Sequence, residues 1–110
     1  MNKFNHAYNG LKIAIKHRAV LIQFVLAILA IVGGIIIKLD HYEWLAFLIC
    51  IGLVITSELL NTCIEMICNY LTIEYDERIK KIKDISSGAV LFSSIIALLV
   101  CIICTIRRFI

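Results

Sequence analysis

Three long apolar stretches limit what this chain can fold into more than any other feature of its sequence. They cover residues 19–37, 44–54 with a helical pattern continuing to about residue 71, and 88–106. Each is long enough for a helix that crosses the ~30 Å hydrocarbon core of a bilayer. A chain of 110 residues, 62% of them hydrophobic, has too little interior to bury so much apolar surface in water. The sequence predicts an all-α integral membrane protein, one domain over residues 1–110, with transmembrane helices at about 19–37, 44–71 and 86–106.

The segment before the first span has the pattern of an amphipathic helix. Phe4, Tyr8, Leu11 and Ile15 recur at spacings of four, three and four residues, which places them on one helix face. Basic and amide side chains occupy another face. Such a helix lies flat at the headgroup level of a membrane. We therefore expect an N-terminal surface helix at about residues 3–17, either a plain anchor or a helix beside a lipid-binding site.

Charged residues lie mainly outside the spans and are unequally divided between the two membrane sides. With the N-terminus inside, eight Lys and Arg residues flank the spans on the inner side and three on the outer side. Positively charged flanks stay in the cytoplasm, so we expect a multi-pass protein of the cytoplasmic (inner) membrane with a cytoplasmic N-terminus. The net charge of +3 is small and scattered, which argues against a nucleic-acid partner.

The second span differs from the others because its later half carries a polar stripe. Glu58, Asn61, Glu65 and Asn69 are spaced three, four and four residues apart, so they share one helix face. Each ionisable group near the bilayer centre costs at least ~2.5 kcal/mol, so these side chains must face protein or water. A helix over residues 44–71 would be ~42 Å long and would emerge from the core. The stripe should run from the inner third of the bilayer to its cytoplasmic surface.

Clustered carboxylates and amides at a membrane surface suit two kinds of chemistry. Hard cations such as Mg²⁺ prefer oxygen ligands, and a carboxylate can accept a proton from an alcohol. The predicted loop that follows, with Arg78, Lys80, Lys81 and Lys83, has the charge to hold phosphates. Two alternatives stay open from the residues alone: polar contacts between helices, and a proton- or cation-coupled transporter that uses Glu58 and Glu65 as carriers.

Three motifs together resemble a known family. Glu58-Leu-Leu-Asn61-Thr-Cys-Ile-Glu65, the later Lys83-Asp84-Ile-Ser-Ser87-Gly, and the N-terminal Tyr8-Asn-Gly10-Leu-Lys12 are similar to the signature of the prokaryotic diacylglycerol kinase and undecaprenol kinase family. The resemblance extends over nearly the whole chain. It implies a homotrimeric membrane kinase that moves the γ-phosphoryl group of MgATP onto a lipid alcohol, diacylglycerol or undecaprenol, at the cytoplasmic face.

The resemblance also implies roles for individual residues. Glu58 would accept the proton of the lipid hydroxyl, Asn61 would position the reacting groups, and Glu65 would bind Mg²⁺. Lys83 would lie near the transferring phosphate. The nucleotide contacts would be completed by Glu74, Tyr75, Asp76 and Asp84. Ser87 and Lys12 would lie beside the lipid substrate.

Two residues depart from the family pattern. Arg18 stands where the family usually has a second metal-binding glutamate, and Asn69 stands where it usually has an acid. The metal would then have fewer protein ligands and more water, or Arg18 would contact a phosphate directly. An inactive family member that serves in helical assembly is a further alternative that these departures suggest.

Overall fold

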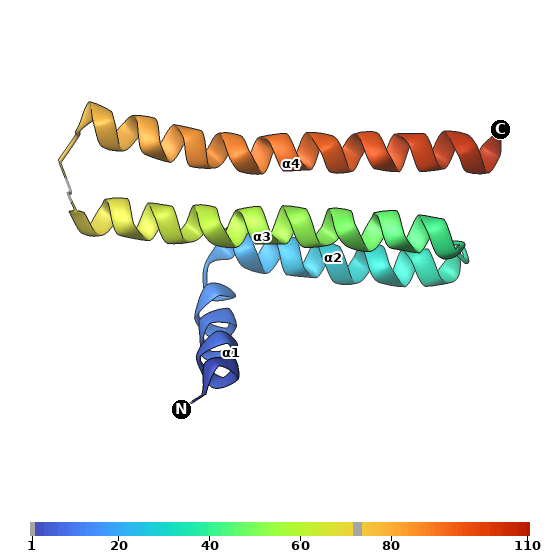
Figure 1. The fold of residues 1–110 in the computed structure, drawn as a ribbon, viewed down its shortest axis with the longest axis horizontal. Helices are drawn as coiled ribbons and strands as arrows, with labels where there is room; N and C mark the ends of the chain where they lie inside the picture. The colour runs from blue at the N-terminus through green and yellow to red at the C-terminus, as the bar shows by residue number, and fades with distance from the viewer. Residues whose placement is uncertain (1, 72–73) are drawn as a thin grey trace.

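The chain consists almost wholly of helices. The structure, a computed structural model, describes residues 2–71 and 74–110. It contains α1 (Lys3–Ala14), α2 (Arg18–Ile36), α3 (His41–Leu71) and α4 (Glu77–Phe109), and the described residues include no strand. Figure 1 shows α2, α3 and α4 side by side along the long axis, with α1 crossing their direction. Because α2, α3 and α4 are each long and apolar enough to cross a membrane, the predicted fold class is confirmed.

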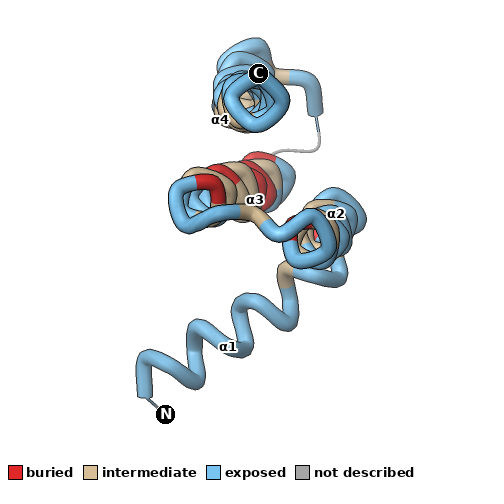
Figure 2. The backbone as a smooth tube through the Cα atoms, turned by 90° about the vertical axis from the view of Figure 1, so that its right-hand side faces the viewer, coloured by how far each residue is buried: buried red, intermediate tan, exposed pale blue. Residues whose placement is uncertain are grey.

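Helix α3 lies between the other two long helices. It packs against both α2 and α4, and the end-on view in Figure 2 shows most of the buried positions gathered on it. The buried residues of α3 are largely polar, whereas apolar side chains along all three long helices are exposed. Lipid tails are as apolar as these side chains, so their exposure costs nothing in a bilayer, and polar contacts between helices stabilise the bundle instead. This arrangement is typical of a membrane protein.

Helix α4 begins at Glu77, earlier than the sequence predicts, so the prediction of a loop up to residue 86 is wrong. Asp76 is the N-cap, and its side chain accepts hydrogen bonds from the backbone N–H groups of Arg78 at 2.8 Å and Ile79 at 3.4 Å. The basic residues 78–83 therefore lie on the first turns of a 33-residue helix. At 1.5 Å per residue this helix is ~50 Å long and extends well past the hydrocarbon core. Charges indicate where the bilayer ends, and a capped helix continues beyond that point.

The other helix bounds differ from the predicted ones by only a few residues. Helix α1 ends at Ala14 rather than near residue 17, and α3 begins at His41 rather than at residue 44. Asp40 and Glu43 form a reciprocal capping box, in which each side chain accepts a hydrogen bond from the backbone N–H of the other, at 2.9 and 3.0 Å. This cap starts α3 before its apolar run begins.

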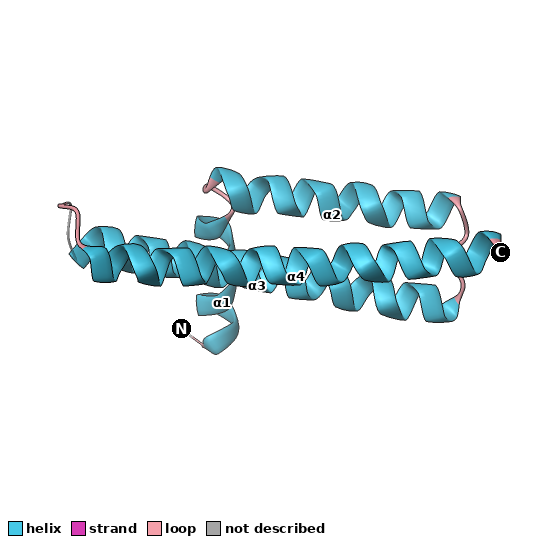
Figure 3. Ribbon diagram, turned by 90° about the horizontal axis from the view of Figure 1, so that it is seen from above, coloured by secondary structure: helices cyan, strands magenta, loops and turns pink. Residues whose placement is uncertain are grey.

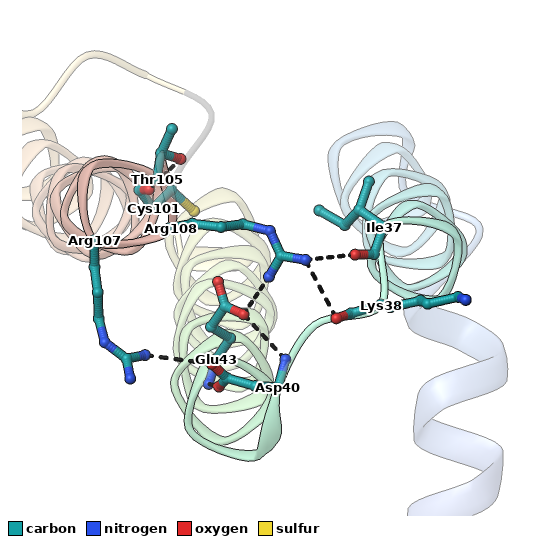
Figure 4. A network of polar contacts seen from close by, with 8 residues as sticks. All are labelled: Ile37, Lys38, Asp40, Glu43, Cys101, Thr105, Arg107 and Arg108. Atoms are coloured by element: carbon teal, nitrogen blue, oxygen red, sulfur yellow. Dashed lines mark hydrogen bonds and ion pairs between the residues drawn. The ribbon is translucent and has the colours of Figure 1, made fainter. Parts of the chain in front are cut away.

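At the end of the bundle that carries the α2–α3 turn, α4 is tied to both other long helices (Figure 3; Figure 4). The guanidinium of Arg108 pairs with the buried Glu43 carboxylate and donates to the carbonyl oxygen of Ile37 at 2.6 Å. Arg107 pairs with Asp40 at 3.4 Å. A cation at the last carbonyls of α2 also complements that helix's dipole. These contacts fix the register of α4 against α3, and so which residues meet at the opposite end.

A close approach at the α2–α3 turn gives a testable prediction. A Cβ at Gly34 would lie 2.9 Å from both Leu39 Cδ1 and Trp44 Cη2, whereas a Cβ at Gly33 would meet no atom within 4 Å. We expect Gly34→Ala to lower the free energy of unfolding in detergent by ~1–3 kcal/mol because the added methyl overpacks the turn. Gly33→Ala should leave it unchanged or raise it, since Ala favours helix. Fluorescence of Trp44, the single tryptophan, reports the transition, and equal effects of the two changes would contradict the packing described.

Candidate active site

The polar stripe of α3, which we call the acidic stripe after its two glutamates, consists of Glu58, Asn61, Glu65 and Asn69. It lies on the half of α3 that is distant from the α2–α3 turn. Glu58 and Asn61 are 7% and 8% exposed, Glu65 is half-buried, and Asn69 is exposed. Burial thus decreases along the stripe toward the end of α3. The stripe connects a position inside the helix bundle with a position at its surface.

Polar contacts run along the junction of α3 and α4, and we call this row the polar seam. Its three cross-helix pairs are Ser57–Ser93 at 2.8 Å, Asn61–Ser86 at 2.7 Å and Asn69–Lys83 at 2.6 Å. Along α3 the contributing residues follow one another at spacings of four and eight positions, so they lie on one face of that helix. Two of the three pairs include a residue of the acidic stripe. The seam therefore holds the stripe against α4.

Asn61 is the centre of a short chain of hydrogen bonds. Its Nδ2 donates to Oε1 of Glu65 at 3.3 Å, and its Oδ1 accepts from the hydroxyl of Ser86 at 2.7 Å. Sequence reasoning selected Ser87, which is exposed on α4, and missed Ser86, which is buried. One signal was present: Ser86 lies three positions after Lys83, so both share a face of α4. What that face contacts becomes visible only once the helices are packed.

Glu58 differs from its neighbours because the residue as a whole is only 7% exposed, although its carboxylate oxygens are not fully enclosed. Among residues 2–71 and 74–110, no hydrogen bond or ion pair to this side chain is found. A carboxylate held at membrane depth without a protein partner is costly, and such residues are functional groups by default. Glu58 is therefore the residue of the stripe with the most freedom to act on a bound molecule.

A hollow opens where the end of α3 faces the start of α4, with a volume of about 700 Å³. We call it the α3–α4 hollow. Its lining includes Asn69 of the stripe and five residues that the sequence analysis assigned to nucleotide contacts: Glu74, Tyr75, Asp76, Lys83 and Asp84. Residues of α3, of α4 and of the connecting positions 74–76 thus line one space.

Most charges in the α3–α4 hollow are already paired. Lys80 Nζ lies 2.7 Å from Asp84 Oδ2, and Arg78 pairs with Asp76 at 3.2 Å. The hydrogen bond from the Arg78 side chain, followed by that from its backbone N–H, holds the pKa of Asp76 below its ordinary value, so this carboxylate stays ionised. Lys83 instead donates to the neutral amide of Asn69, and within the described part of the chain no ion pair involves it. Its positive charge remains available to an anion.

Three predicted site residues belong neither to the acidic stripe nor to the α3–α4 hollow. Arg18 is exposed at the start of α2, Ser87 is exposed on α4, and Lys12 of α1 places Nζ 4.5 Å from the centre of the Tyr8 ring. His17, next to Arg18, lines an apolar groove of about 510 Å³ together with Thr62 and other residues of α3 and α1. The α1–α2 junction therefore lies at the level of the acidic stripe, although these three residues do not join the hollow.

The described residues include no group of three or more His, Cys, Asp or Glu side chains that could hold a metal ion. A divalent cation would depend on fewer protein ligands. Glu65 fits this role, because the amide of Asn61 fixes one of its carboxylate oxygens while the side chain stays partly exposed. Mg²⁺ commonly binds through one or two carboxylates and completes its shell with phosphate oxygens and water.

The fold and the site together define a multi-pass membrane protein in which a buried acidic residue and an open hollow lined by charges of both signs lie at the same end of the helices. In a comparison with protein families, the profile of the family described as Prokaryotic diacylglycerol kinase matches residues 5–105. The chain belongs to this family. Its members are lipid kinases, so the protein is a kinase of lipid metabolism. No curated protein matches the chain in a sequence comparison.

Proposed function

We propose that the protein phosphorylates a membrane lipid alcohol, diacylglycerol or undecaprenol, with ATP as the phosphoryl donor, at the cytoplasmic face of the inner membrane. The observation that carries this proposal is the contact between Lys83 and Asn69 at 2.6 Å. This contact joins Lys83, which lines an open hollow and pairs with no carboxylate among the described residues, to the acidic stripe that would enter the bilayer. A water-soluble phosphate donor and a lipid hydroxyl would meet along this line.

The α3–α4 hollow would hold the nucleotide. Lys83 supplies a positive charge for the phosphates, and the exposed ring of Tyr75 offers a surface for the base. Carboxylates of Glu74 and Asp84 are acceptors for the ribose hydroxyls. Phosphoryl transfer requires alignment and charge neutralisation more than covalent chemistry, and these residues supply both. Lys83 would act on the transferring phosphate itself.

Glu58 would act at the lipid end of the site. The lipid hydroxyl oxygen forms a bond to the γ-phosphorus while the bond from that phosphorus to the β–γ bridging oxygen breaks. The hydroxyl proton passes to the Glu58 carboxylate, and ADP leaves with the bridging oxygen. A base near the acceptor contributes to such a step because the attacking oxygen must lose its proton. The burial of Glu58 and the lack of a partner for its carboxylate among the described residues support this role.

Glu65 would be the protein ligand of Mg²⁺, with Asn61 fixing its carboxylate. The bound ion would neutralise negative charge that develops on the phosphate oxygens. Arg18, at the level of the stripe, would contact a phosphate, because a guanidinium binds phosphate and repels a cation. Ser87 and Lys12 would lie beside the lipid, on surfaces that one protomer leaves exposed.

A homotrimer is part of this proposal. Within one protomer the described residues bring Lys83 to the stripe but leave Arg18, Lys12 and Ser87 outside the α3–α4 hollow. Neighbouring protomers would complete the site by covering the exposed faces of α2 and α4. The excess of Lys and Arg at the ends of α1, α2 and α4 that adjoin the stripe supports a cytoplasmic N-terminus.

The proposal is tested by phosphoryl transfer in nanodiscs. Purified protein is given [γ-³²P]ATP and Mg²⁺ with diacylglycerol, with undecaprenol, or with neither, and labelled lipid is separated by chromatography. We expect label in one of the two lipids, and none when EDTA removes the metal. Absence of label in both lipids would overturn the kinase activity. Proton uptake by liposomes reconstituted with the same purified protein would then favour the transporter, for which Glu58, without a partner among the described residues, is the candidate carrier.

A further inference from the structure

Ser86 is buried on α4, and its hydroxyl makes an unusual contact. Hydroxyl groups inside helices commonly donate to a carbonyl of their own helix. Thr105 does so at 2.8 Å, and the hydroxyls of Ser57 and Ser93 each lie within hydrogen-bond distance of such a carbonyl, at 2.8 and 3.0 Å, although one of the two donates to the other. Ser86 instead donates across the polar seam to Oδ1 of Asn61 at 2.7 Å. Ser86 and Asn61 are 6% and 8% exposed, so water has little access to this bond.

The contact anchors the end of the Asn61 amide that faces away from Glu65. An asparagine side chain has one end that accepts hydrogen bonds and one that donates them. With the hydroxyl of Ser86 on Oδ1, the Nδ2 group is directed to the Glu65 carboxylate, 3.3 Å away. The reversed amide would place two acceptor oxygens against each other. The acceptor-only carboxylate of Glu65 selects the orientation in which Asn61 donates to it, and the hydrogen bond from Ser86 holds the amide in that orientation.

We infer that Ser86 is a positioning residue for the phosphoryl transfer proposed above: through Asn61 it holds the Glu65 carboxylate in the geometry that receives the divalent cation and its nucleotide. The inference rests on the proposed function and adds to it a buried residue of α4. Outer partners of a metal ligand orient that ligand, and their loss typically costs 10–100-fold in metal affinity or activity. The chain offers a sharp comparison, because Ser93 lies on the same helix and in the same seam but contacts Ser57 rather than the stripe.

The experiment compares Ser86→Ala with Ser86→Thr and with the matched control Ser93→Ala. Binding of Mn²⁺ with the non-hydrolysable analogue AMP-PCP is measured by electron paramagnetic resonance, and the Mg²⁺ dependence of lipid labelling is measured separately. We expect Ser86→Ala to weaken Mn²⁺ binding and to raise the Mg²⁺ concentration for half-maximal rate by about 10-fold or more. Ser86→Thr keeps the hydroxyl and should stay within ~3-fold of wild type, and Ser93→Ala within ~2-fold.

A double-mutant cycle separates positioning from general loss of packing. In an Asn61→Ala background, Ser86→Ala should cost less than ~2-fold, because its effect passes through the amide that is already absent. Full additivity, or equal effects of Ser86→Ala and Ser93→Ala in an active enzyme, would overturn the inference alone. A wild-type protein that labels neither lipid would overturn the proposed function and the inference with it.

Discussion

Replacing Glu58 with glutamine is expected to reduce the rate of lipid phosphorylation ~10²–10⁴-fold, the contribution typical of a positioned general base. Glutamine has the same size but cannot accept the proton of the lipid hydroxyl. The half-saturating ATP concentration should change little, since Glu58 does not line the α3–α4 hollow. Initial rates of label transfer, measured at saturating ATP and lipid, give the result directly.

The loss should be specific to the buried position. Glu77→Gln makes the same chemical change at an exposed site in the first turn of α4, and we expect at least half of the wild-type rate from it. Glutamine carries no charge at this largely buried position, where the carboxylate has no partner among the described residues, so Glu58→Gln should be at least as resistant to unfolding as wild type. An enzyme with near-normal rate after Glu58→Gln would exclude this carboxylate as the proton acceptor.

The second large effect is expected at Lys83. Within the described residues, Lys83 is the one positively charged residue lining the α3–α4 hollow that has no acidic partner. Changing it to methionine removes this charge and keeps an unbranched apolar side chain of similar length. Loss of a single group that stabilises developing charge costs roughly 10²–10³-fold in rate. Because the proposed site also places Lys83 beside the nucleotide, we expect the half-saturating ATP concentration to rise as kcat falls.

Lys81→Met is the matched control for this change. Lys81 lies two positions away in the same basic segment, is exposed, and does not line the hollow. It should alter kcat/KM for ATP by no more than about 2-fold, as expected for an exposed charge screened by salt. Equal losses from Lys81→Met and Lys83→Met would mean that the segment acts through its overall charge, and would remove Lys83 from the transferring phosphate.

The two predictions differ in how far the sequence supports them. The face shared by Glu58, Asn61 and Glu65 follows from helical spacing, because side chains three and four positions apart always lie together. The pairing of Lys83 with Asn69 does not follow, since 14 positions and a change of helix separate them. The same holds for Ser86, which differs from its exposed neighbour Ser87 only in the direction that α4 turns it.

The sequence alone therefore determines the three spans, the N-terminal helix and the acidic stripe. Hydrophobic length and helical period are local properties that packing does not change. Only the tertiary structure decided that α4 begins at Glu77, that Ser86 donates to Asn61, and that the end of α3 and the start of α4 enclose a hollow. Those features depend on the register between antiparallel helices. That register is set by contacts at both ends of the bundle, including the pairing of Arg108 with Glu43, 65 positions apart in the chain.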